Sequence, residues 1–159
     1  MTCTIISNGH EIDGVCKNEH EEPLITIKHR LREIIWQLYC NGYNEFFVNC
    51  NYGIPLWSAE IITALKIYNE ITLNIVVPFE EQCRNWDENN RDRYYAVHEK
   101  ADNIEFACYK FEVDCEEKAD KIMLDNSDFI VIFGKHKDKL YAQDYSIKNN
   151  IKFTIIPLN

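Results

Sequence analysis

Short apolar segments alternate with longer segments of helical periodicity along the whole chain. The segment Phe129–Phe133 is the most continuously apolar and ends at Gly134, so we expect it inside a sheet that is covered on both faces. Strands that alternate with helices pair in parallel and are joined by right-handed crossovers. The sequence therefore predicts an α/β fold with a doubly wound, mostly parallel sheet of about six strands and helices on both faces.

Hydrophobic periodicity places the individual elements. Leu24, Leu31 and Leu38 share one helical face, and Asn41-Gly42 forms a helix stop. Asp114, with Glu117 three residues later, is a carboxylate analogue of a capping box. The expected strands cover residues 2–7, 46–48, 72–78, 103–109, 129–133 and 153–156, and the expected helices cover residues 23–41, 55–68, 87–101, 114–126 and 140–149.

Length and charge limit the class of protein. The chain has 159 residues, a mass of 18.9 kDa and 46% hydrophobic residues, which suits one domain over residues 1–159. Its formal charge of -9 and pI near 5.0 argue against a duplex nucleic acid partner, which clustered Lys and Arg would have to neutralise. There is no apolar run of bilayer length and no signal pattern, so we expect a cytoplasmic protein without a membrane partner.

Seven cysteines raise the question of a disulfide or zinc framework. Their spacings contain no C-x-x-C pair, and an odd number leaves one unpaired. Cys16 and His20 lie four residues apart, but no second ligand pair accompanies them. We therefore expect reduced thiols, no metal and no known cofactor.

The stretch from Phe46 to Glu60 is a candidate anion site. It is expected to form a buried strand, a tight turn through Gly53 and a helix opened by Pro55. Backbone N–H groups and the positive end of a helix dipole converge at such a turn and can hold a phosphate. An ordinary turn from strand to helix is the competing interpretation.

In parallel sheets, ligands bind beyond the carboxyl ends of the strands, where the strand order reverses. The loops at this edge are rich in Asn, Gln, Tyr and Trp, which can hydrogen-bond to or stack on a base or a ribose. The candidate ligand-binding residues are Gly9, His10, Asn49, Asn51, Tyr52, Gly53, Trp57, Glu60, Phe79, Gln82, Trp86 and Gly134.

Several short motifs occur in order over most of the chain. They are Gly9-His10, Gly53-x-x-x-Trp57-Ser58-Ala59-Glu60, Pro78-Phe79-x-x-Gln82-x-x-x-Trp86, Tyr94, Ala101-Asp102 and Met123-Leu124-x-x-Ser127-Asp128. This set resembles the YpsA-like group of the SLOG superfamily, which also contains the LOG phosphoribohydrolases and the DNA-processing Smf proteins. The resemblance implies a Rossmann-like fold and a site for a small-molecule nucleotide derivative. Together with a surplus of apolar side chains, it also favours a homodimer.

The chain departs from the superfamily at positions that matter for catalysis. It has Gly9-His10-Glu11 where the group tends to carry Gly-His-Arg, and it lacks the Pro-Gly-Gly-x-Gly-Thr-x-x-Glu motif of the LOG enzymes. Glu60 matches the site carboxylate of the group, which makes it the candidate catalytic residue. As plain structure, Glu60 is a favourable acid near a helix N-terminus.

Other candidates also have two interpretations. Trp57 and Trp86 could stack on a base or belong to the core, and His10 could act as an acid or base or only orient its loop. Three functions follow from these alternatives. The first is a nucleotide-binding regulatory protein with a degenerate SLOG pocket, the second is an N-glycosidic hydrolase, and the third is an interaction protein with a vestigial pocket. The missing glutamate motif favours the first.

Overall fold

The computed structural model describes residues 1–7, 19–134 and 141–158. Its sheet has six strands, all parallel, in the order β4-β3-β2-β1-β5-β6. The strands are β1 (Thr2–Ser7), β2 (Glu45–Val48), β3 (Thr72–Phe79), β4 (Asn103–Cys108), β5 (Phe129–Gly134) and β6 (Lys152–Pro157). The expected doubly wound α/β architecture is confirmed.

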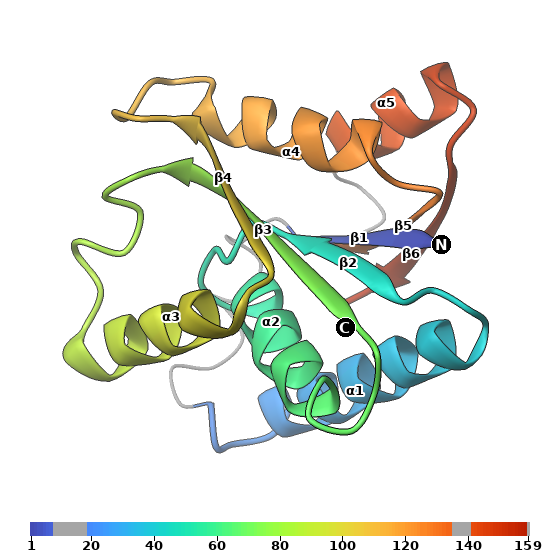
Figure 1. Ribbon diagram of the computed structural model, residues 1–159, viewed down its shortest axis with the longest axis horizontal. Helices are drawn as coiled ribbons and strands as arrows, with labels where there is room; N and C mark the ends of the chain where they lie inside the picture. The colour runs from blue at the N-terminus through green and yellow to red at the C-terminus, as the bar shows by residue number, and fades with distance from the viewer. Residues whose placement is uncertain (8–18, 135–140, 159) are drawn as a thin grey trace.

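Five helices cover the sheet. They are α1 (Leu24–Cys40), α2 (Ile54–Leu65), α3 (Glu88–Lys100), α4 (Cys115–Asp125) and α5 (Tyr141–Lys148). Helices α1, α2 and α3 lie on one face, and α4 and α5 lie on the other (Figure 1). Each face has its own cluster of buried side chains, as expected for parallel strands that are apolar on both sides.

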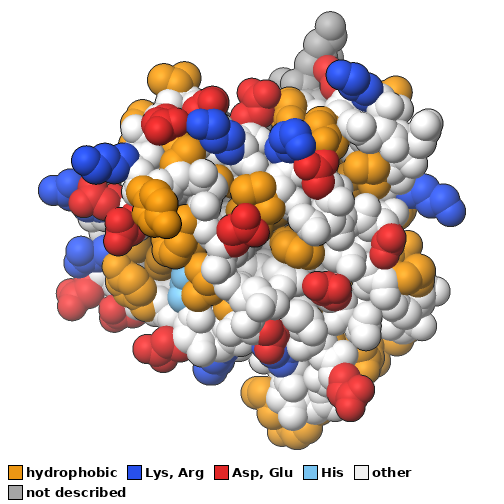
Figure 2. All heavy atoms as spheres, turned by 45° about the horizontal axis from the view of Figure 1, so that its top comes forward, with side chains coloured by type: hydrophobic (Ala, Val, Ile, Leu, Met, Phe, Trp, Pro, Cys, Tyr) orange, Lys and Arg blue, Asp and Glu red, His pale blue; other side chains and the backbone are white. Residues whose placement is uncertain are grey.

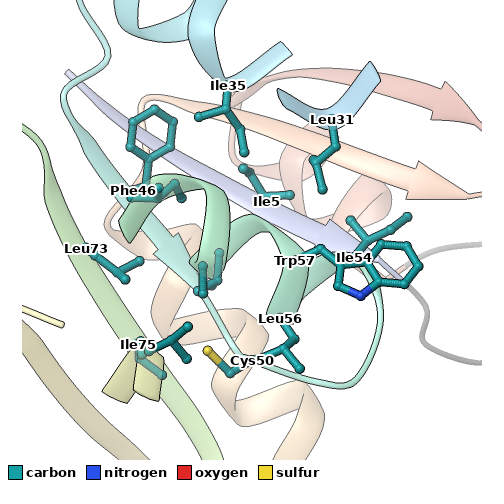
Figure 3. Packing of buried hydrophobic residues seen from close by; sticks show 14 of the residues in the cluster. Ile5, Leu31, Ile35, Phe46, Cys50, Ile54, Leu56, Trp57, Leu73 and Ile75 are labelled. Carbon is teal, nitrogen blue, oxygen red and sulfur yellow. The ribbon is translucent and has the colours of Figure 1, made fainter. Parts of the chain in front are cut away.

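The larger cluster lies under α1 and α2. Figure 3 shows Leu31 and Ile35 of α1 and Trp57 of α2 packed around the strands that carry Ile5 and Phe46. All five side chains are at most 1% exposed. Burial of one such large apolar side chain contributes roughly 1.5–3 kcal/mol, so this face fixes α2 rigidly against the sheet.

The strand order reverses between β1 and β5. β1 pairs with β2 on one side, with Cys3 opposite Phe46, and with β5 on the other, with Ser7 opposite Phe133. The prediction that residues 129–133 form an interior strand is confirmed, because β5 lies between β1 and β6. The segments that follow β1 and β5, residues 8–18 and 135–140, lie outside the described residues.

Two helix starts differ in how they are capped. The carboxylate of Asp87 accepts the backbone N–H of Asn90 at 3.0 Å, which is the usual capping bond at the start of α3. Asp114 precedes α4, but its side chain makes no capping bond and instead pairs with Lys118 at 3.1 Å. The expected capping box at Asp114 is therefore absent, because the lysine one turn later competes for the carboxylate.

Candidate functional site

Three amide side chains meet at the carboxyl edge of β2 and β3. Gln82 donates from Nε2 to the Asn49 carbonyl at 3.0 Å and to Asn51 Oδ1 at 2.5 Å, and Asn51 donates its N–H to Asn49 Oδ1 at 3.1 Å. We call Asn49, Asn51 and Gln82 the amide cluster. Gln82 is 8% exposed, and its Oε1 has no hydrogen-bond partner among the described residues. A buried acceptor without a donor costs about 1–3 kcal/mol, so a ligand N–H or a water at this atom would be stabilising.

The start of α2 uses most of its own donors. Leu56 donates its N–H to the Asn51 carbonyl at 3.1 Å, Trp57 donates to the Gly53 carbonyl at 2.9 Å, and Pro55 has no N–H. Gly53 has φ 96° and ψ -135°, a conformation that is essentially confined to glycine. The turn is therefore as sharp as expected, but few first-turn amides remain available to a phosphate.

The aromatic candidates differ in exposure. Trp57 is 1% exposed, with the Lys28 ammonium 4.7 Å from its ring centroid. Trp86 is partly exposed, and its ring packs edge-on against Tyr52 and Tyr94 with centroid distances of 5.9 Å and 5.4 Å. Of the two tryptophans, Trp57 is buried, whereas Trp86 is partly exposed and contacts Tyr52, the residue after Asn51.

Glu60 is held by a bidentate ion pair. Arg93 of α3 donates from Nε to Oε1 at 2.6 Å and from Nη2 to Oε2 at 2.8 Å. Arg93 also donates to Glu19 at 3.0 Å, and Glu19 in turn accepts from Lys28 and from the Tyr52 hydroxyl. Both oxygens of the candidate catalytic carboxylate thus already have a strong donor.

This network shifts the ionisation of its members. Burial alone would raise the pKa of Glu19, but hydrogen bonds from Arg93, Lys28 and Tyr52 outweigh it and lower that pKa to about 2. Burial and the Glu19 carboxylate raise the pKa of Tyr52 to about 12. The pKa of Arg93 is raised, chiefly by its bonds to Glu60. Glu19 is therefore ionised and Tyr52 protonated near neutral pH, and the carboxylates of Glu19 and Glu60 pair with Lys28 and Arg93.

Asp120 is a further acidic group at this edge, and it is absent from the sequence-based candidates. Helix α4 runs antiparallel to the strands, and Thr4 Oγ1 donates to the Met123 carbonyl at 3.2 Å, so Asp120, one turn earlier, lies nearer the carboxyl edge. Burial and the charge of Glu116 raise the pKa of Asp120 to about 7. A hydrogen bond with Asn49 lowers this pKa but does not outweigh the other two effects. In the sequence, Asp120 stands out only as an acidic residue next to Ala119, which belongs to the apolar face of the predicted helix.

Two of the remaining candidates end strands of the sheet. Phe79 ends β3 and packs edge-on against Phe111 with a centroid distance of 5.2 Å. Gly134 is the last residue of β5, opposite Pro157 of β6. Gly9 and His10, and also Cys16, lie outside the described residues.

The face of the molecule seen in Figure 2 carries charges of both signs. On the face seen in Figure 2, Lys and Arg side chains are interspersed with Asp and Glu side chains. Within residues 1–7, 19–134 and 141–158, no helix is long and apolar enough to cross a membrane.

Comparison with known families and proteins gives three findings. The model of YpsA, described as the YspA SLOG family, matches residues 10–154, which confirms the resemblance seen in the motifs. UPF0398 proteins of Bacillus cereus (strain B4264) and Bacillus thuringiensis (strain Al Hakam) are each 29% identical over 93 residues, or 58% of this chain. The chain spans about half the length of these relatives, since the match covers 50% of each.

The third finding is a structural likeness. The chain superposes on DNA processing protein A from Helicobacter pylori with a TM-score of 0.67 and 12% sequence identity. The structure of that protein was reported for its unique single-stranded DNA binding mode. The match covers all of this chain and 66% of that chain. This finding overturns our expectation that the partner is only a small molecule. The expectation counted net charge against nucleic acid, but single strands are also held by stacking of their bases on aromatic side chains.

Proposed function

Because this chain belongs to the YspA SLOG family, we propose that its carboxyl-edge site binds one nucleotide unit of a single-stranded nucleic acid. The observation that carries the proposal is the amide cluster, in which Gln82 Oε1 is a buried acceptor with no donor in the part of the chain that the structure describes. Bases of single strands expose their hydrogen-bonding edges, and side-chain amides pair with such edges. The edge of a base would supply the N–H that Gln82 Oε1 lacks, either from an exocyclic amine or, in thymine, from the ring N3–H.

Neighbouring groups support the same ligand. Trp86 offers a partly exposed ring beside the cluster, and base–aromatic stacking contributes about 1–3 kcal/mol. Lys28 and Arg93 are paired with Glu19 and Glu60, so little positive charge is free to attract phosphates. The site therefore favours recognition of a base over capture of a highly charged duplex.

Turnover is not part of the proposal. The Arg93 guanidinium occupies both oxygens of Glu60, so the carboxylate would have to leave a bidentate pair before it could act on a glycosidic bond. General acid–base catalysis requires a group positioned on the reacting bond. Base release from a nucleotide that is lost in Glu60→Gln or Asp120→Asn would show that the chain is a hydrolase.

The test is fluorescence anisotropy with a labelled (dT)12 strand, an RNA 12-mer and a hairpin duplex, with free mononucleotides as competitors. We expect the single strands to bind and the duplex not to bind. Gln82→Met, which keeps the side-chain length and removes both polar atoms, should weaken binding at least tenfold, about 1.4 kcal/mol. Tyr68→Ser is the matched control, because Tyr68 is 90% exposed and follows the carboxyl end of α2, at the opposite edge of the sheet.

Thermal melting of each variant separates lost binding from lost folding. Equal affinity of wild type and a folded Gln82→Met variant would refute the proposed site. Competition by a mononucleotide at the same affinity as (dT)12 would show that the site takes a free nucleotide and gains nothing from a strand.

A further inference from the structure

A groove opens at the carboxyl ends of β3 and β4, separate from the amide cluster. It has a volume of about 810 Å³. Its lining consists of Phe79, Glu80, Glu81, Arg84, Asn85, Tyr109, Lys110 and Phe111. The function proposed above uses none of these side chains, and the sequence-based candidates include only Phe79.

Two large rings of the groove face solvent. Tyr109 is 82% exposed and Phe111 is 69% exposed. Phe111 is steadied by the edge-on contact with Phe79, and the Tyr109 carbonyl accepts the N–H of Glu80 at 3.4 Å. The rings are thus anchored to the end of β3 while most of their surface is free. Exposed aromatic surface that is contiguous and held in place is a candidate interaction site.

The charges of the groove nearly cancel. Arg84 pairs with Glu81 at 2.9 Å, whereas the ammonium of Lys110 has no ion pair within the described part of the chain. The ammonium of Lys110, between the exposed rings of Tyr109 and Phe111, suits a ligand whose bases stack on the rings and whose phosphates contact the ammonium. A base stacks on an aromatic face regardless of sequence, and a lysine beside it contacts the backbone.

The groove and the amide cluster share one segment, residues 80–86. Gln82 points from this segment to Asn51 after β2, while Glu81 and Arg84 line the groove beside β4. Because β2, β3 and β4 are neighbours in the sheet, the two features lie along one continuous edge.

We propose that Tyr109 and Phe111 stack on bases adjoining the one held at the amide cluster, so that a single strand crosses the carboxyl edge from β2 to β4. This inference rests on the proposed function and adds a second subsite to it. The occupant is a single strand because two free rings, one unpaired ammonium and a connected base-pairing cluster match the alternation of bases and phosphates.

The test compares (dT)12 with the labelled mononucleotide dTMP in the same anisotropy assay. Tyr109→Ala should weaken binding of (dT)12 about 5- to 150-fold, the equivalent of one lost stacking contact, and leave binding of dTMP, which has no adjoining base, unchanged. Val113→Ala is the matched control, because Val113 is 97% exposed near the same loop and does not line the groove. Lys110→Gln should flatten the salt dependence by a slope of about 0.7, the value for one phosphate contact to a single strand.

The two proposals fail in different ways. If Gln82→Met weakens (dT)12 and a folded Tyr109→Ala variant does not, the groove is not a subsite and the proposed function stands. If Tyr109→Ala weakens (dT)12 and Gln82→Met does not, the strand binds the groove and the amide cluster is not its site. Failure of the wild type to bind any single strand overturns both, and so would Tyr109-dependent binding of an aromatic peptide without binding of (dT)12.

Discussion

Replacement of Asp120 by asparagine should stabilise the protein relative to wild type, and this gain in stability should be larger at alkaline than at acidic pH. The pKa of Asp120 is raised from 3.8 to about 7, so between these values the folded state binds a proton that the unfolded state has released. Stability from this group is therefore present below the unfolded pKa and is lost as pH rises through the folded pKa. Asparagine keeps the shape of the side chain and has no charge to lose.

The size of the effect follows from the two pKa values. At about 1.36 kcal/mol per pKa unit, the raised pKa of Asp120 lowers the free energy of unfolding by about 1.7 kcal/mol at pH 5 and about 4 kcal/mol at pH 8, compared with a group whose pKa does not change on folding. The gain from Asp120→Asn should accordingly grow by about 2–3 kcal/mol between pH 5 and pH 8. The fixed cost of replacing an oxygen with an NH₂ group cancels in this difference.

Urea unfolding of both proteins at pH 5, 6, 7 and 8 measures the difference directly. Asp92→Asn is the control, because it makes the same replacement at an exposed carboxylate of α3. Parallel curves for wild type and Asp120→Asn across this range would refute the burial of a carboxyl group at the edge of the sheet.

Three further predictions concern the ion network and the turn before α2. Arg93→Met should cost about 2–3 kcal/mol in urea unfolding, because Glu60 loses its bidentate donor and Glu19 loses one of its three donors. Arg91→Met, on the exposed side of α3, should cost under about 0.5 kcal/mol, and similar costs for the two variants would contradict a structural network. Gly53→Ala should cost about 1–3 kcal/mol because of its φ of 96°, and an unchanged melting temperature would contradict that geometry. The pKa of Glu19, lowered to about 2, means that wild type should lose stability relative to Glu19→Gln as pH falls from about 4.5 to about 2, and a constant difference in acid titrations would contradict the ion pairs.

Much of the fold could be predicted from local pattern. The order of strands and helices and the interior place of residues 129–133 follow from periodicity and from uninterrupted apolar runs, which reflect burial on one or both faces. The capping of Asp114 could not be predicted, because whether a carboxylate bonds the backbone or a lysine depends on side-chain geometry. The proposal of one domain over the full chain stays a prediction.

Part of the candidate site, the grouping of its three amide side chains, could be predicted from the order of strands and loops. Asn49, Asn51 and Gln82 lie in loops that a parallel sheet must bring to one edge, so topology alone places them together. The pairing of Glu60 with Arg93 joins two helices, and no spacing within either helix indicates it. Asp120 was missed because its ionisation depends on burial and on neighbours from another element, which one-dimensional pattern does not contain.

The central place of β1 in the sheet has a consequence for synthesis. Cys3 pairs with Phe46 on one side and with Phe129 on the other, and the second partner lies 126 residues further along the chain. While the ribosome is still adding α4, β1 carries one bare edge and the apolar side chains that α4 and β5 will cover. Contacts so distant in sequence form slowly, and unpaired strand edges invite association with other chains. The growing polypeptide therefore passes most of its translation with one edge of its central strand β1 unpaired.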